Sequence, residues 1–219
     1  LLELALGCQS PKVVVLDVNV LYWTCKKNAA AFYELGAKVP VFRYHDRWKS
    51  LSAGDFFSLP HYTAESPNRG YLMKTGREYS SRGDYMQAHP GRGRPGRGSL
   101  RHLRQIAKIC AREQIPLVLC SVPSAANWNG SRHNAIAKIA EELGVPYVDG
   151  NLEKIGIDWH TDSPDGGDHM NPSGAAKVTA WIGDYLRRNY DLPDRREDPA
   201  YENWNRDAED FRARVAAAE

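Results

Sequence analysis

Asp165-Gly166-Gly167-Asp168-His169-Met170-Asn171-Pro172 joins a polar loop to the start of a helix, and the rest of the chain can be placed around it. Asn171 suits the N-cap, and Pro172 fits the first helical position, where a missing N–H costs nothing. Apolar residues then recur at three- and four-residue spacing: Ala175, Val178, Trp181, Ile182, Tyr185 and Leu186. His169 is therefore expected in a loop at the start of a helix that packs on a core.

Helix and strand patterns alternate ahead of this stretch. Residues 100–110 have a helical apolar spacing and 115–120 form an apolar run. Residues 136–143 and 145–149 repeat the helix–strand order, and residues 12–19 are a β-branched run typical of a buried parallel strand. This alternation predicts βαβ units and an α/β fold with a mostly parallel sheet.

The chain is expected to form an α/β domain over residues 1–190, with a long irregular insertion at about 50–99. Residues 191–219 form a polar extension and a last helix that packs on the domain. An arginine–glycine tract at 91–98 is predicted to be a flexible, solvated connector. The alternative for this tract, which the sequence favours less, is binding of RNA or phosphate.

Composition excludes few classes of protein. The 219 residues are 42% hydrophobic and 26% charged, with a net charge of +2, so no global attraction to nucleic acid or membrane is expected. No run approaches the roughly 20 apolar residues of a membrane-spanning helix.

The chain opens at Leu1 without a methionine, and we expect its natural beginning to lie upstream. Cys110 and Cys120 lie in apolar patterns and are predicted to be buried thiols.

The polar loop offers a histidine with three candidate carboxylate partners, Asp162, Asp165 and Asp168. A histidine can take a proton from a hydroxyl if a carboxylate fixes its tautomer. Asp165 can turn back to His169 across Gly166-Gly167, whereas the side chain of the adjacent Asp168 tends to diverge. Turn geometry therefore favours Asp165 over Asp168, and the alternative is that these aspartates only cap turns. Metal binding by this group, with His160, matches no zinc spacing, so no metal or cofactor is expected.

The order of these elements resembles the SGNH (GDSL-like) hydrolases, especially uncharacterised members from Gram-positive bacteria and, more distantly, cell-envelope acyl-transfer proteins. The stretches that carry the resemblance are Tyr44-His45-Asp46-Arg47-Trp48, Ser121-Val122-Pro123-Ser124, Asn127-Trp128, Val148-Asp149 and Asp165 to Ala175. The resemblance implies a three-layer α/β/α (flavodoxin-like) architecture that lacks its first strand in this chain. It covers residues 100–190 best and fails across the arginine–glycine tract.

The resemblance also assigns roles to residues. His169 is the general base and then acid, and Asp165 or Asp168 orients it, although the usual family spacing would put the acid at Gly166. Asn19 takes the place of the family's oxyanion-hole donor, with a strand-end turn as its alternative role. The nucleophilic serine belongs to a first strand–helix turn, and no matching block precedes Lys12. We therefore expect this chain alone to be inactive.

The function implied for the intact protein is an esterase or O-acyltransferase acting on an acylated carbohydrate or a cell-envelope polymer, outside the membrane. The side chains expected to line the substrate cleft are Tyr44, His45, Arg47, Trp48 and Asn127. For residues 44–48, the alternative is a structural corner in which Trp48 packs and Arg47 pairs with Asp46. The alternative for the whole chain is a non-catalytic module that binds a glycan or a protein partner.

Overall fold

A computed structural model of the chain describes residues 2–23, 68–79 and 82–218. Apart from Trp23, these residues belong to one unit, which comprises Leu1–Tyr22 and Pro67–Glu219. Four residues predicted to line a substrate cleft lie outside the described residues: Tyr44, His45, Arg47 and Trp48.

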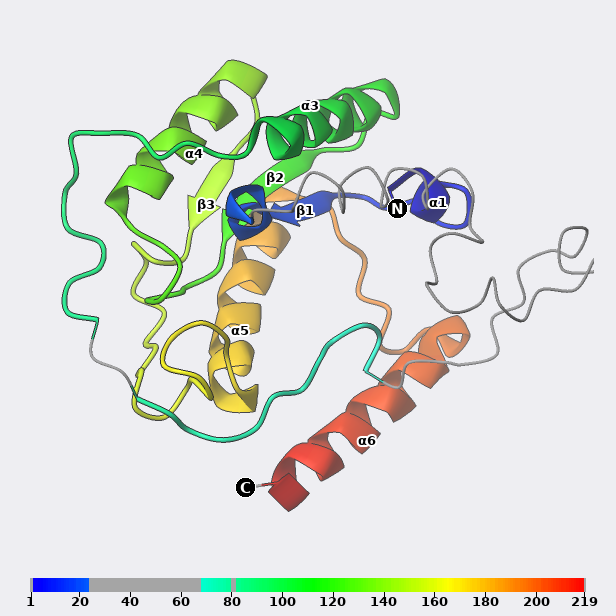
Figure 1. Cartoon of the computed structure of the whole chain (residues 1–219). Coiled ribbons are helices and arrows are strands. Elements are labelled where there is room, and N and C mark those ends of the chain that lie inside the picture. Colours follow the sequence, from blue (N-terminus) through cyan, green and yellow to red (C-terminus); the bar gives the residue numbers. More distant parts are fainter. Residues whose placement is uncertain (1, 24–67, 80–81, 219) are drawn as a thin grey trace, which may run out of the picture. The chain divides into compact units, whose positions relative to one another are not determined.

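The sheet of the described chain has three parallel strands in the order β1-β2-β3 (Figure 1). These strands are β1 (Val14–Asp17), β2 (Leu117–Ser121) and β3 (Tyr147–Asp149). Their register places Leu16 opposite Leu119 and Cys120 opposite Val148. The predicted α/β class and the parallel pairing of the strands are therefore confirmed.

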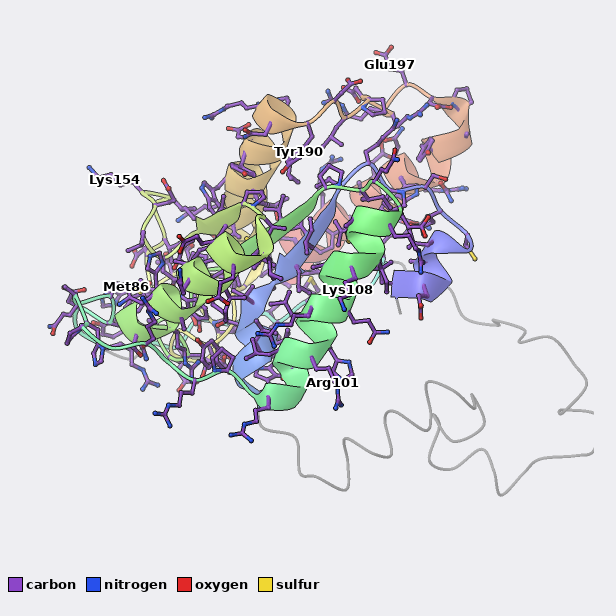
Figure 2. The ribbon with its side chains drawn as sticks, turned by 90° about the horizontal axis from the view of Figure 1, so that it is seen from above. Met86, Arg101, Lys108, Lys154, Tyr190 and Glu197 are labelled. Carbon is purple, nitrogen blue, oxygen red and sulfur yellow. The ribbon has the colours of Figure 1, made fainter. Side chains whose placement is uncertain are left out.

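Helices connect and follow the strands. They are α1 (Leu2–Leu6), the 3-10 helix η1 (Val18–Tyr22), α3 (Arg97–Arg112), α4 (Gly130–Leu143), α5 (Pro172–Asn189), the 3-10 helix η5 (Pro199–Tyr201) and α6 (Glu202–Ala218). α3 connects β1 to β2, and α4 connects β2 to β3. Both connections cross the sheet in the same direction, so right-handed crossovers place both helices on one face. Figures 1 and 2 show α3 and α4 side by side along that face.

The core lies between α3, α4 and the strands. Its buried side chains are Val18, Leu21, Leu103, Cys110, Leu117, Leu119, Trp128, Ile136 and Ala140. Because side chains alternate along a strand, Val118 and Cys120 point to the opposite face, where they are also buried. Cys110 and Cys120 are thus buried free thiols, as predicted, whereas Cys8 is exposed.

β1 is shorter than the predicted strand over residues 12–19. It ends at Asp17, whose Oδ1 accepts a hydrogen bond from the Asn19 backbone N–H at 3.1 Å. Short side-chain to backbone bonds of this kind compete with strand pairing and begin turns. The chain accordingly enters η1 at Val18, and Asn19 belongs to that 3-10 helix rather than to the strand.

The arginine–glycine tract is held at two points, although a flexible connector was predicted. Gly93 N–H donates to the Ser131 carbonyl at 2.7 Å, and Gly96 N–H donates to the Leu21 carbonyl at 3.0 Å. Residues 92–96 form neither helix nor strand, and α3 begins directly after them. The tract therefore runs along η1 and the start of α4.

α6 carries the last predicted helix and contacts residues 68–71. The ring of Phe211 meets that of Tyr71 edge to face at 5.6 Å, and Arg69 pairs with Asp207 at 2.6 Å. No residue of α6 is fully buried, and half of Trp204 is exposed. Its apolar stripe is therefore covered in part by a segment from the long insertion.

Candidate functional site

The loop that carries His169 is fixed at its end by the cap of α5. The Asn171 side chain accepts a hydrogen bond from Gly174 N–H at 3.2 Å, and Pro172 occupies the first turn. The Asn171 amide also donates to the carbonyls of Thr161 at 2.7 Å and Gly76 at 3.0 Å. The cap predicted from sequence is therefore confirmed, and the same buried side chain also ties α5 to a distant segment.

Asp162 anchors the beginning of the loop. Its side chain is fully buried, and it accepts hydrogen bonds from Lys177 Nζ at 2.6 Å, Ser173 Oγ at 2.8 Å and Asp158 N–H at 2.8 Å. Burial raises the pKa of this carboxyl, but the bonds from Lys177, Asp158 and Ser173 outweigh it and hold the pKa below its usual value. Asp162 is thus an ionised structural group.

Gly166 and Gly167 form the turn between Asp165 and His169. Both have positive φ angles, +69° and +96°, which side chains rarely allow. Gly167 N–H donates to Ser163 Oγ at 2.8 Å, while its carbonyl accepts bonds from Ser124 Oγ and Ala126 N–H, both at 3.1 Å. The turn therefore rests on the loop that follows β2, at the carboxyl edge of the sheet.

This turn brings Asp165 back onto His169. The His169 backbone N–H donates to Asp165 Oδ1 at 2.8 Å, and the ring Nδ1 lies 2.6 Å from Asp165 Oδ2. Burial acts to raise the pKa of Asp165, but bonds from the His169 backbone, the His169 ring and Lys74 lower it overall. The carboxylate is ionised and fixes one edge of the imidazole.

Asp168 lies further from the ring and has a different partner. Its Oδ2 is 3.3 Å from His169 Nδ1, and its Oδ1 accepts a hydrogen bond from the Asn127 side-chain amide. The Asn127 carbonyl in turn accepts a bond from Arg132. Asn127, predicted to contact substrate, thus positions Asp168, and Asp165 makes the closer and doubly bonded contact with His169.

Lys74 is the member of this cluster that the sequence reasoning missed. Its Nζ lies 3.0 Å from His169 Nδ1 and 3.3 Å from Asp165 Oδ2. The segment that carries it is bonded to the histidine loop, because Glu78 N–H donates to the Ser163 carbonyl and Gly166 N–H donates to the Glu78 carbonyl. No periodic or motif signal marks Lys74 in the sequence.

The other edge of the imidazole is open within the described chain. Nearly half of the His169 side chain is exposed, and its Nε2 makes no hydrogen bond with a described residue. Ser121 is buried and bonded to Tyr147, and Ser124 is bonded to Gly167. No serine, threonine or cysteine of residues 2–23, 68–79 and 82–218 bonds to the His169 ring, so these residues do not complete a nucleophile–base pair.

Asn19 lies at the carboxyl end of β1, at the same sheet edge as the loops after β2 and β3. Its side-chain Oδ1 is buried without a hydrogen-bond partner in the described chain. The neighbouring Asp17 has a raised pKa because of burial, which outweighs the bonds from the Asn19 and Val122 backbones. No hydrogen bond or ion pair joins Asn19 to His169 among the described residues.

A second aspartate–histidine pair lies at the end of β3. Asp149 Oδ2 is 2.7 Å from His133 Nδ1 and accepts bonds from Trp128 Nε1 at 3.0 Å and Tyr147 OH at 2.8 Å. Asp149 Oδ1 accepts two more bonds, from the backbone and the side chain of Asn151. Burial raises the pKa of Asp149, but these bonds lower it overall. The network is saturated and acts as a structural junction.

Asp165, Asp168 and His169 also form a group whose potential ligand atoms lie within 4.8 Å of one another. Two oxygens and one nitrogen would suit a divalent cation. The Lys74 ammonium, however, lies 3.0 Å from the same ring nitrogen, so a positive charge already faces these atoms. The geometry fits a histidine hydrogen-bonded to Asp165 better than a metal centre.

Comparisons with known proteins give no match, whether with protein-family models, with curated proteins or with solved structures. Within residues 2–23, 68–79 and 82–218, every helix is too short or too polar to cross a membrane.

Proposed function

We propose that this chain is part of an SGNH-type hydrolase or O-acyltransferase in which His169 is the general base. The observation that carries the proposal is the double attachment of His169 to Asp165, through the backbone at 2.8 Å and through Nδ1 at 2.6 Å. A carboxylate on Nδ1 favours the tautomer with a free Nε2, which can accept a proton from a hydroxyl.

In the proposed reaction, Nε2 takes the proton of a serine hydroxyl as that oxygen attacks the ester carbonyl. The tetrahedral intermediate collapses to an acyl-serine, and His169 returns the proton to the departing alcohol. Water or an acceptor hydroxyl then attacks the acyl group by the same steps in reverse. The serine is outside the described residues, and Asn19 is the proposed donor to the oxyanion.

The proposed architecture is three-layered, with α5 on the face of the sheet opposite α3 and α4. Burial of Val118 and Cys120 on that face supports this arrangement, as does the place of α5 below the strands in Figure 1. The proposed substrates, acylated carbohydrates or envelope polymers, and action outside the membrane rest on the sequence resemblance.

A non-catalytic module that binds a glycan or a protein is the second candidate. It is favoured by the half-exposed ring of His169 and by the absence of a hydroxyl bonded to it among the described residues. In such a module, Asp165 and Asp168 would serve only to hold the turn.

Two measurements on the protein at its natural length separate these candidates. Hydrolysis of p-nitrophenyl acetate and labelling by a fluorophosphonate probe, which reacts with activated serines, are both expected and both lost in His169→Ala. His160→Ala is the matched control, because His160 lies in the same region and stacks on Tyr79 instead. Absence of turnover and labelling, or their full retention in His169→Ala, would overturn the hydrolase proposal.

A further inference from the structure

Lys74 reaches the Asp165–His169 pair from 91 residues away in the sequence, measured to Asp165. Three hydrogen bonds hold the following segment on the histidine loop: Asn171 to the Gly76 carbonyl, Glu78 N–H to Ser163, and Gly166 N–H to Glu78. The backbone that follows Lys74 is therefore fixed on the histidine loop, and the Lys74 side chain lies beside Asp165 and His169.

The Lys74 ammonium and the Asp165 carboxylate compete for one atom. His169 Nδ1 lies 2.6 Å from Asp165 Oδ2 and 3.0 Å from Lys74 Nζ. A neutral imidazole nitrogen either carries a proton and donates, or carries a lone pair and accepts. Lysine can only donate and an ionised aspartate can only accept, so Nδ1 can hydrogen-bond to one of them at a time.

The two alternatives place the proton of the ring on different nitrogens. When Nδ1–H donates to Asp165, Nε2 has a free lone pair. When Nδ1 accepts from Lys74, the proton lies on Nε2, which then cannot act as a base. Asp168 Oδ2, at 3.3 Å from Nδ1, favours the first state along with Asp165.

We propose that Lys74 sets the tautomer of His169 by competing with Asp165 for Nδ1. Lys74 is thus a positioning residue: it keeps a fraction of the His169 rings in the Nε2–H tautomer, which cannot act as a base. A role for Lys74 in catalysis rests on the proposed function, whereas its effect on the tautomer of His169 is independent of that function.

The test is nitrogen NMR of the ¹⁵N-labelled protein at a pH where the ring is neutral. Two-bond ¹H–¹⁵N spectra distinguish a protonated ring nitrogen from one with a lone pair, and His169→Gln identifies the signals. Lys74→Met is expected to raise the Nδ1–H fraction and Asp165→Asn to lower it. The control Lys108→Met, on the exposed face of α3, is expected to leave the signals unchanged. Backbone spectra of each variant check the fold.

Identical His169 ring signals in the parent protein and in Lys74→Met would overturn the proposal. Measuring ester hydrolysis in the same variants distinguishes failure of the tautomer proposal from failure of the proposed function. If turnover depends on His169 but the Nδ1–H fraction is unchanged in Lys74→Met, only the proposed competition is wrong. If the tautomer responds to Lys74 but no variant hydrolyses an ester, the competition stands and the hydrolase proposal fails. If both hold, kcat/KM in Lys74→Met rises by the same factor as the Nδ1–H fraction.

Discussion

Asp165 binds His169 with both carboxylate oxygens, one on the backbone N–H at 2.8 Å and one on ring Nδ1 at 2.6 Å. The backbone bond fixes the position of the carboxylate independently of the imidazole ring. The ring therefore has a hydrogen-bond partner in a fixed place. Asp168 has no such backbone bond to the histidine and is turned toward Asn127.

Replacing these two aspartates should therefore have unequal effects on ester hydrolysis in the protein at its natural length. Asp165→Asn removes the negative charge on Nδ1 and is expected to lower kcat by about 10²- to 10⁴-fold, as in serine triads. Asp168→Asn should lower it by less than about tenfold, because Asp165 remains in place. Equal losses, or a larger loss from Asp168→Asn, would assign the orienting role to Asp168.

Acid is expected to destabilise the fold through its buried carboxylates. Burial raises the pKa values of Asp149 and Asp162, but hydrogen bonds outweigh it and both pKa values lie below the ordinary value of 3.8. A lowered folded-state pKa stabilises the protein above about pH 4, and this stabilisation is lost as the pH falls through the lowered value. Urea unfolding between pH 7 and pH 2 should show the free energy of unfolding falling mainly below pH 4.

Asp162→Asn tests the origin of that acid dependence. The variant should lose about 2–3 kcal/mol of stability at pH 7, because Lys177 loses its buried partner. Its stability should also fall less steeply below pH 4 than that of the parent. An unchanged slope would mean that other groups govern acid unfolding.

Two glycines of α5 should respond in opposite directions to alanine. A Cβ on Gly174 would lie 2.6 Å from the Asp162 carbonyl oxygen, a backbone atom that cannot move aside cheaply. Gly174→Ala should therefore cost about 1–3 kcal/mol or more. A Cβ on Gly183 meets nothing within 4 Å, and Gly183→Ala should stabilise the helix by about 0.5–1 kcal/mol. Thermal or urea unfolding of both variants provides the comparison, and destabilisation by Gly183→Ala would contradict it.

The thiols should differ in reactivity. Burial, with Asp17 and Asp149 nearby, raises the pKa of Cys120 to about 12, and burial also raises the pKa of Cys110. In a Cys25→Ser background, one equivalent of a disulfide reagent should react quickly at pH 8, at the exposed Cys8. Two further equivalents should react only on unfolding, and Cys8→Ser should abolish the fast phase. Rapid reaction at Cys120 in the folded protein would contradict its burial.

Local patterns in the sequence were sufficient to predict much of the fold. Apolar spacing predicted α4 and α5, which each bury one face of a regular repeat, and continuous apolar runs predicted the parallel strands, of which β2 is buried on both faces. The sequence did not reveal where β1 ends, since the Asp17–Asn19 bond competes with an otherwise favourable β-branched run. It also did not reveal that the arginine–glycine tract is bonded to η1 and α4 through backbone atoms, which leave no mark in composition.

The candidate site was predictable only where it is local. Gly166-Gly167 predicted that Asp165 turns back to His169, and the structure places the two in contact. Lys74 could not be found in this way, because its approach depends on long-range backbone pairing of residues 76–78. The pairing of His133 with Asp149 was likewise hidden, although the end of a parallel strand is a place to look for polar groups.

The fully hydrogen-bonded carboxylate of Asp149 limits local opening of the chain at the carboxyl end of the sheet. Its donors come from β3, from Asn151 just after β3, from α4 and from the chain between β2 and α4, so none of these segments can open without breaking bonds to a charge that is almost fully buried. Fluctuations at this end of the sheet should be concerted, with Trp128, His133 and Tyr147 released together in a single cooperative unit. The histidine loop is hydrogen-bonded to the same chain segment through the Gly167 carbonyl. We therefore expect the histidine loop to open only together with that segment.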